Sequence, residues 1–305
     1  MVEPQAGGRT DGSGDPRRAG GRTDGSGDPR PPARRTGRAG RNLPAALAVG
    51  GGLGAVVVLS LLWWRPAFLV VVVAAIAAAI WEMVRATGAS GAHPPLVPLL
   101  GGGVLMTGLA WFAGPEGLSI GLFVTVLAII GWRLGRGPAG YQRDVGAAIL
   151  IAVYVPFLAG FAVLLAVPDD GHWRVLAALG LVVLTDTGGY VAGVFAGRHP
   201  MAPSVSPKKS WEGLAGSLVA AAAGGAIGMV ILFDLTWWAG ALFGLAVAGA
   251  AVLGDLAESL LKRDLGVKDM SGLLPGHGGV MDRLDSILFA APTAYLLFVL
   301  LAPPT

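Results

Sequence analysis

The stretch from Gly254 to Ser286 contains the residues best suited to chemistry. It holds six of the chain's nineteen Asp and Glu residues, although apolar segments border it on both sides. If its first third is helical, at about 100° per residue, the charged side chains share one face and the leucines another. Asp282 and Asp285 form a second acidic pair where the chain becomes apolar again. Intramembrane carboxylates are costly and usually functional, so we expect a site here; the alternative is an amphipathic helix followed by a solvated loop.

A glycine-rich segment lies between these two groups of charges. Residues 275–279 read Pro-Gly-His-Gly-Gly, and proline and glycine interrupt helices, so a loop is predicted. Its backbone amides can approach a ligand closely. His277 can donate to a phosphate, with an ordinary loop histidine as the alternative. A zinc site is not expected, because the chain has no cysteine and no second histidine lies nearby.

A second polar group occupies residues 185–213. Asp186 falls deep inside an apolar segment, where a buried carboxylate requires a cation or hydrogen-bond donors. The loop that follows is rich in hydroxyl and ammonium groups, which suit phosphate oxygens. These groups belong to Ser204, Ser206, Lys208, Lys209 and Ser210. An ordinary positively charged loop would also explain the two lysines, but it would not explain Asp186.

Carboxylates combined with lysines, arginines and a glycine-rich loop indicate chemistry on phosphates. Such a set implies a hard cation, most simply Mg²⁺. Mg²⁺ on a nucleoside triphosphate, flanked by basic side chains, is what phosphoryl or nucleotidyl transfer requires. The membrane setting predicts a lipid as the second substrate. A lipid phosphate needs no general base, because its second pKa of about 6 leaves it largely dianionic at neutral pH.

The elements that must position these residues are membrane helices. Hydrophobic residues make up 54% of the chain and charged residues 13%, against about 25% charged residues in soluble domains. We therefore predict an all-α, polytopic integral membrane protein with about nine transmembrane helices. Each expected span is close to the roughly 20 residues that cross a bilayer. The spans are predicted at 43–63, 66–84, 95–113, 117–134, 145–167, 174–196, 212–233, 237–260 and 283–301.

The distribution of charge predicts the orientation. With the N-terminus in the cytoplasm, 20 of the 22 Lys and Arg residues fall on the cytoplasmic side, and only Arg65 and Arg174 fall outside. This is the bias of the positive-inside rule. Both polar groups then face the cytoplasm, after the sixth and eighth spans, where they can converge.

Residues 1–42 differ from the remainder of the chain. A twelve-residue segment at 6–17 is repeated at 19–30, and the region is rich in Gly, Pro and Arg. We expect a disordered cytoplasmic tail. It could contact anionic lipid headgroups, or it could be a solvated tail without an assigned role. The remainder is divided into N-terminal transmembrane helices at 43–170 and a C-terminal transmembrane catalytic region at 171–305.

Residues 185–286 resemble the phosphatidate cytidylyltransferase family, also called CDP-diacylglycerol synthase. The family motif runs Ser, two residues, Lys-Arg, four residues, Lys-Asp, a short gap, Pro-x-His-Gly-Gly, two residues, and Asp-Arg-x-Asp. Every position is filled here, by Ser259, Lys262, Arg263, Lys268, Asp269, Pro275, His277, Gly278, Gly279, Asp282, Arg283 and Asp285. Segments 186–188, 206–213 and 254–259 also resemble the family, whereas the resemblance is weak over the first five spans and absent from the tail.

The resemblance implies that CTP and phosphatidate react to give CDP-diacylglycerol and pyrophosphate, with Mg²⁺ as cofactor and a monovalent cation such as K⁺ beside it. It also implies a homodimer in the cell (inner) membrane, among membrane lipids, with a cytoplasm-facing funnel. No nucleic-acid partner is expected. Asp255 and Asp282 match the family's metal-binding aspartates. The expected catalytic residues are Asp255, Asp282, Lys262, Arg263 and Asp285. The expected substrate-binding residues are Lys208, Lys209, Ser206, Lys268, His277, Gly278, Gly279, Arg283 and Asp186.

Two other classes of protein remain as alternatives. An ion-coupled transporter would use buried carboxylates as ion sites, but transporters usually show paired repeats with broken helices in both halves. Here the acidic residues of the spans are concentrated in the last third of the chain. A CTP-using lipid kinase, acting on polyprenol or phytol, would also need CTP and Mg²⁺. The complete motif favours the cytidylyltransferase.

Overall fold

The computed structural model describes residues 43–274 and 278–303, with side chains from residue 49 onward. The predicted tail and His277 therefore lie outside the described residues. Residues Arg41–Thr305 form one compact unit, and in its described part the helices are joined by loops and by one short β-hairpin. The all-α fold is confirmed. The division between residues 170 and 171 stays a prediction, although α5 and α9, from opposite sides of it, pack together.

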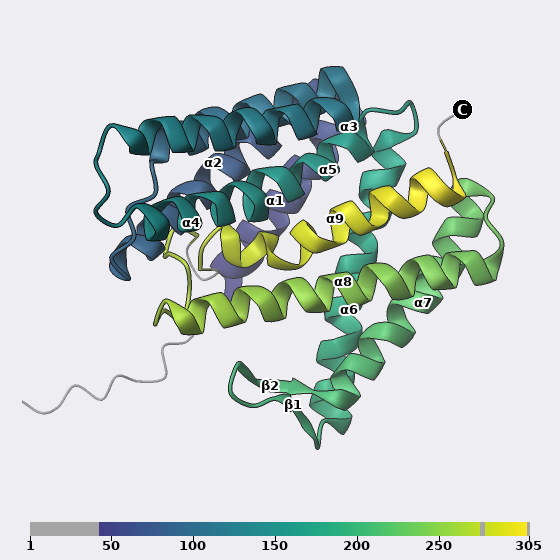
Figure 1. The fold of residues 1–305 in the computed structure, drawn as a ribbon. Coiled ribbons are helices and arrows are strands. Elements are labelled where there is room, and N and C mark those ends of the chain that lie inside the picture. The colour runs from purple at the N-terminus through teal and green to yellow at the C-terminus, as the bar shows by residue number, and fades with distance from the viewer. Residues whose placement is uncertain (1–42, 275–277, 304–305) are drawn as a thin grey trace, which may run out of the picture. The chain divides into compact units, whose positions relative to one another are not determined.

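The helices follow the predicted apolar segments closely (Figure 1). Proline and glycine separate several of them, as expected from their effect on helices. Their bounds are α1 Leu43–Trp63, α2 Arg65–Ala89, α3 Leu96–Leu134, α4 Tyr141–Ala152, α5 Leu158–Ala166, α6 Gly171–Ala196, α7 Trp211–Phe233, α8 Trp237–Asp264 and α9 Met281–Leu301. One π-helical turn, Val153–Phe157, joins α4 to α5 around Pro156, so these three elements form a single span.

Helix α3 is a helical hairpin rather than one long rod. At Gly114 the backbone turns with φ of 67°, and Pro115 begins the second arm. A β-carbon on Gly102 would collide with Thr125, and one on Gly121 would lie 2.9 Å from Met106. These contacts require the two arms to run antiparallel. α3 therefore supplies both of the spans predicted at 95–113 and 117–134.

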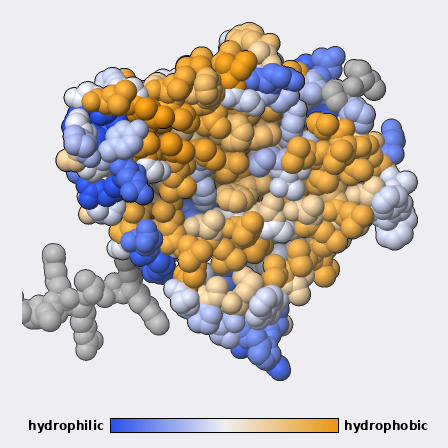
Figure 2. All heavy atoms as spheres, in the orientation of Figure 1, coloured by the Kyte–Doolittle hydropathy of each residue, from blue (hydrophilic) through white to orange (hydrophobic). Residues whose placement is uncertain are grey.

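Membrane-length helices dominate the described part of the chain. Seven of its helices are long and apolar enough to cross a bilayer when α3 is counted once, and α1 contributes a shorter apolar helix over the residues whose side chains are described. Hydrophobic residues cover the helices on the face shown in Figure 2, and hydrophilic residues gather at the ends and around the hairpin. This distribution is that of a multi-pass membrane protein, with about nine spans.

Helices α6, α7 and α8 pack closely because small residues lie between them. A β-carbon on Gly188 would lie 2.6 Å from the carbonyl oxygen of Gly216, so only glycine permits this approach of α6 to α7. Between α6 and α7 the chain forms two short strands that pair antiparallel, β1 (Pro200–Ala202) and β2 (Ser206–Ser210), and we call them the hairpin. Ser210 then caps α7 by accepting a hydrogen bond from the Gly213 amide at 3.1 Å. The hairpin thus lies beside the last turn of α6 and the first turn of α7 (Figure 1).

Candidate functional site

A cavity of about 310 Å³ lies between α6, α7, α8 and the hairpin. Its charged lining consists of Asp186, Lys208, Lys209 and Asp255. Lys209 Nζ lies 2.5 Å from Asp255 Oδ2, so the hairpin is tied to α8 across the cavity. The sequence placed these residues in two separate polar groups. The fold brings them to one cavity, because the hairpin folds back over the space between α6 and α8.

Asp186 lies well inside its span, within α6, as the sequence predicted, but it is not enclosed by neighbouring helices. Its side chain lines the cavity and is exposed. The packing of α6, α7 and α8 leaves an opening at this level, which periodicity along one helix does not indicate. The carboxylate therefore faces the same cavity as Lys208 and Lys209.

A second cluster lies between α8 and α9, where Lys262 is shared by two carboxylates. Its Nζ is 2.5 Å from Glu258 Oε2 and 2.8 Å from Asp282 Oδ1. Glu258 has none of its surface exposed, and its contact with Lys262 is an ion pair without hydrogen-bond alignment. Oε1 of Glu258 has no hydrogen-bond partner among the described residues. The Lys262 ammonium group is therefore the charged partner of the buried Glu258 side chain.

Asp282 also ties the glycine-rich loop to the start of α9. Its Oδ2 accepts hydrogen bonds from the amides of Gly279 at 2.7 Å and Met270 at 3.0 Å. Gly278, with φ of 81°, allows the chain to turn directly beside this carboxylate. One helical turn later, Asp285 is half-buried and accepts from the Ser286 amide at 2.7 Å.

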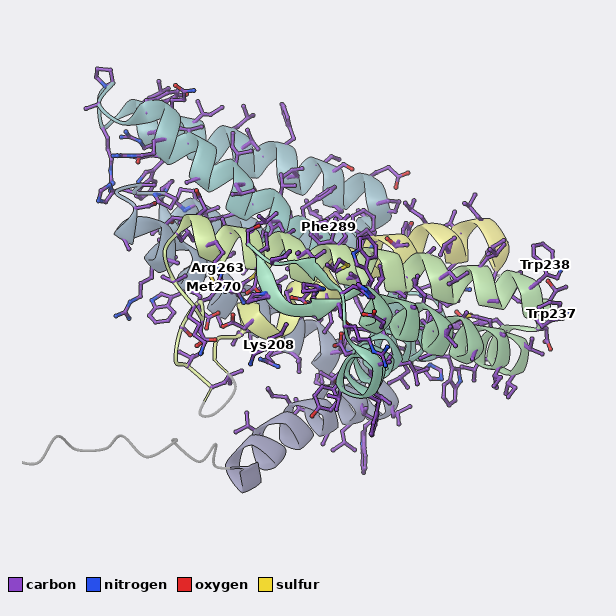
Figure 3. The ribbon with its side chains drawn as sticks, turned by 90° about the horizontal axis from the view of Figure 1, so that it is seen from below. Lys208, Trp237, Trp238, Arg263, Met270 and Phe289 are labelled. Atoms are coloured by element: carbon purple, nitrogen blue, oxygen red, sulfur yellow. The ribbon has the colours of Figure 1, made fainter. Side chains whose placement is uncertain are left out.

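The remaining predicted residues lie around these two clusters. Arg263 Nε donates to the carbonyl oxygen of Val205 at 3.2 Å, which fastens the end of α8 to the hairpin. Lys268 and Arg283 are exposed, and the structure gives neither an ion pair with a described residue. Ser206 lies in β2 but is not among the residues that line the cavity. Figure 3 shows Lys208, Arg263 and Met270 at one end of α8, with Trp237 and Trp238 at the other.

Sequence reasoning missed three glutamates that support the site. Glu258 shares Lys262, as described above, and its position on the polar face of α8 was the available signal. Glu212 accepts from the amides of Arg198 at 3.1 Å and His199 at 3.2 Å and pairs with the His199 ring, so it anchors the hairpin. Glu82, in α2, is fully buried beside the start of α9. An acid next to a long apolar run was its signal in the sequence.

The carboxylates suit Mg²⁺ in donor chemistry. Mg²⁺ is usually held by one or two carboxylates together with substrate phosphates and water, so a dense all-protein cage is not required. Within the described ranges no group of three or more acidic or histidine side chains is arranged to hold a metal. Asp255 Oδ2 and Asp282 Oδ1 instead each face a lysine ammonium group. Other carboxylates, such as Glu258 and Asp144, also pair with a basic side chain, so the assignment of Asp255 and Asp282 to a metal stays a prediction.

The chain matches the family model described as "Cytidylyltransferase family" over residues 45–301. The chain belongs to the cytidylyltransferase family. Among its relatives is the phosphatidate cytidylyltransferase of Mycobacterium leprae, which is 42% identical over 277 residues, covering 86% of this chain and 89% of the relative. The protein of the same name from Mycobacterium tuberculosis is 40% identical over 274 residues, covering 86% and 84%. That from Synechocystis sp. is 41% identical over 136 residues, covering 42% and 44%.

The family match extends well beyond the motif that suggested it. It includes both arms of α3 and the helices that contain Glu82 and Asp144, a region over which the resemblance to the motif is weak. The cavity and the α8–α9 cluster are therefore parts of one cytidylyltransferase chain that extends from α1 to α9.

Proposed function

We propose that this chain transfers the cytidylyl group of CTP to phosphatidate and releases CDP-diacylglycerol and pyrophosphate, as a step of phospholipid biosynthesis. The observation that carries the proposal is the cavity in which Lys208, Lys209, Asp186 and Asp255 meet at the end of a bundle of membrane-length helices. Lysine ammonium groups suit the phosphates of a nucleotide, and the adjoining apolar helices suit a lipid. The cavity can therefore serve one polar and one lipid substrate. The names of the relatives, matched over most of both chains, supply the substrate pair.

The reaction needs a phosphate oxygen of phosphatidate to attack the α-phosphorus of CTP. One P–O bond forms, the bond to the β-phosphate bridging oxygen breaks, and pyrophosphate leaves with the negative charge. Lys208 and Lys209 line the cavity and neutralise triphosphate oxygens. The remaining phosphates are served by basic residues in the last turn of α8, in the loop after it and in the first turn of α9, namely Lys262, Arg263, Lys268 and Arg283. Gly278 and Gly279 let the backbone approach the nucleotide, with His277 beside them. No general base is required, because the attacking phosphate is largely ionised.

Asp255 and Asp282 are proposed to hold Mg²⁺, with a monovalent cation such as K⁺ beside it. Bound there, the metal would stabilise charge on the α-phosphate and on the leaving pyrophosphate. Lys209 and Lys262 pair with these same carboxylates. With a dication bound by the two aspartates, Lys209 and Lys262 would be able to contact phosphate oxygens, Lys262 while still paired with Glu258. Asp186 and Asp285 orient the basic groups around them.

The proposed setting is the cell membrane, with the cavity facing the cytoplasm where CTP is available. The bias of Lys and Arg towards the loops on this side supports the orientation. The proposed assembly is a homodimer, as the resemblance implies.

The test uses purified protein in detergent with phosphatidate and CTP labelled at either the α- or the γ-phosphate. We expect α-label in the lipid phase and γ-label in pyrophosphate. Diacylglycerol, which lacks the attacking phosphate, should accept neither label and serves as the acceptor control. Transfer of γ-label to a lipid would identify a kinase instead and overturn the proposal.

A further inference from the structure

Glu82 on α2 makes the longest-range set of hydrogen bonds to the site. Its carboxylate is fully buried and accepts from three donors. Oε1 accepts from Ser271 Oγ at 2.5 Å and from the Val280 amide at 2.9 Å, and Oε2 accepts from the Met281 amide at 2.8 Å. Val280 is the N-cap of α9 and Met281 is its first residue, and both lie about 200 positions from Glu82 in the sequence.

Two of the three donors, the amides of Val280 and Met281, are groups that α9 itself cannot satisfy. The first amides of any α-helix have no partner inside the helix, and they form its positive end. Side-chain caps normally come from a neighbouring residue, as Ser210 does for α7. Val280, at the N-cap of α9, makes no side-chain cap hydrogen bond. Glu82, from α2, therefore caps the N-terminus of α9 in place of a neighbouring side chain.

Two carboxylates together fix the whole turn before α9. Asp282 takes the amides of Met270 and Gly279, and Glu82 takes the next two amides along the chain. A β-carbon on Gly279 would lie 2.7 Å from a Glu82 oxygen, so this glycine admits the carboxylate to the backbone. The position of Asp282, and with it that of Arg283 and Asp285, depends on this turn.

We propose that Glu82 is a positioning residue, which holds the start of α9 and the Ser271 segment against α2 and so places Asp282, Arg283 and Asp285 for the reaction. The expected effect on turnover rests on the proposed function. The clamp, meaning the hydrogen bonds from Ser271, Val280 and Met281 to Glu82, does not depend on it. The carboxylate is needed rather than an amide. Both Glu82 oxygens act as acceptors, so a glutamine would turn an NH₂ group towards a backbone N–H.

The experiment compares Glu82→Gln with Glu116→Gln, a matched change at an exposed glutamate near the turn of α3. Hydrogen–deuterium exchange is followed in peptides covering 278–286 and in a reference peptide from α5. Values of kcat and KM for CTP and the melting temperature are measured on the same samples. Ser271→Ala, which removes one of the three donors, serves as a milder variant.

In Glu82→Gln we expect exchange of residues 278–286 to rise at least about tenfold, the scale of losing hydrogen bonds to a charged acceptor. We expect kcat to fall at least about tenfold, because small displacements of a positioned group can cost on the order of 100-fold. KM for CTP should change less than kcat, because Lys208 and Lys209 bind the nucleotide from the hairpin, whereas the turn that Glu82 holds carries Asp282. Ser271→Ala should give the same pattern to a smaller extent.

Exchange and kcat equal to those of Glu116→Gln would overturn the proposal. So would a uniform rise in exchange that includes the α5 reference, because that pattern indicates general destabilisation. If the unsubstituted protein makes no CDP-diacylglycerol, the proposed function fails. The exchange data then still decide whether Glu82 clamps α9.

Discussion

At the two proposed metal positions each aspartate forms an ion pair with a lysine, and one of these lysines, Lys262, is shared with Glu258. Lys209 holds Asp255, and Lys262 holds Asp282. Without these partners, like-charged carboxylates would repel one another, and those with little exposure to water would be costly to keep ionised. The lysines can therefore act twice, first as partners of the acids and then as ligands of phosphate.

Replacing either carboxylate by its amide should reduce turnover and leave the fold intact. For Asp255→Asn and Asp282→Asn we expect kcat to fall by at least ~100-fold, the scale of losing one electrostatic stabiliser. Asp264→Asn, on the exposed end of α8, is the control and should cost far less. The measurement is kcat against Mg²⁺ concentration in detergent. Wild-type behaviour of the first two, or a dead Asp264→Asn alone, would contradict the metal assignment.

The hairpin is the element that delivers Lys208 and Lys209 to the cavity, and Glu212 fixes its base. The carboxylate accepts two backbone amides and contacts the His199 ring, all at the junction of α6 and the hairpin. An element of two short strands is marginal without such an anchor. We therefore assign the alignment of the hairpin to Glu212.

Glu212→Ala should raise KM for CTP roughly tenfold, since each of the lost hydrogen bonds contributes about 0.5–1.5 kcal/mol. The value of kcat at saturating CTP should change less, because the α8–α9 cluster is untouched. Glu116→Ala is the control. An unchanged KM for CTP, measured with phosphatidate in excess, would show that the hairpin does not need this anchor.

Local sequence information predicted the elements much better than the contacts between them. Apolar run lengths and Pro or Gly breaks placed the last span at 283–301, and the helix begins at Met281. The motif supplied Lys262 and Asp282, but periodicity could not pair Lys262 with Glu258 or Lys209 with Asp255. Those pairs depend on how α8 meets α9 and the hairpin. Glu82 was missed for the same reason, since its partners are almost 200 residues away.

At the scale of the molecule, the loops separate into two ends. Arg65 donates to the carbonyl oxygen of Pro168 at 2.5 Å, so two loops predicted to lie outside are in contact. Glu82 and Ser271, predicted on the cytoplasmic side, are hydrogen-bonded to each other. Arg133, near the end of α3, and Asp144, near the start of α4, form a buried ion pair across the loop predicted on the same side. These contacts join segments that the charge distribution assigns to the same side, and the side that faces the cytoplasm stays a prediction.

Single cysteines should report this arrangement, because the chain has none of its own. Ser204→Cys and Gly272→Cys occupy exposed positions and should react with an impermeant thiol reagent only from the cytoplasmic side. Asp169→Cys, which is fully exposed, should react only from the outer side. Labelling is scored in intact cells against inverted membrane vesicles, with the unsubstituted chain as the blank. Reversed labelling would contradict the orientation.

The clamp between α2 and α9 also sets the order in which the site can be built during translation. Glu82 enters the membrane almost 200 residues before the amides that will hold it, which at 5–20 residues per second is a delay of roughly 10–40 s. In that interval the Glu82 carboxylate lacks the donors from Ser271, Val280 and Met281, and it must be satisfied by water at the membrane surface or by the nearby Arg85. Ribosome-stalled chains that end before α9 should therefore be cut by protease in the 90–95 segment more readily than released chains; equal cutting would show that α2 settles without α9. The nascent enzyme would thus remain inactive until its last helix leaves the ribosome.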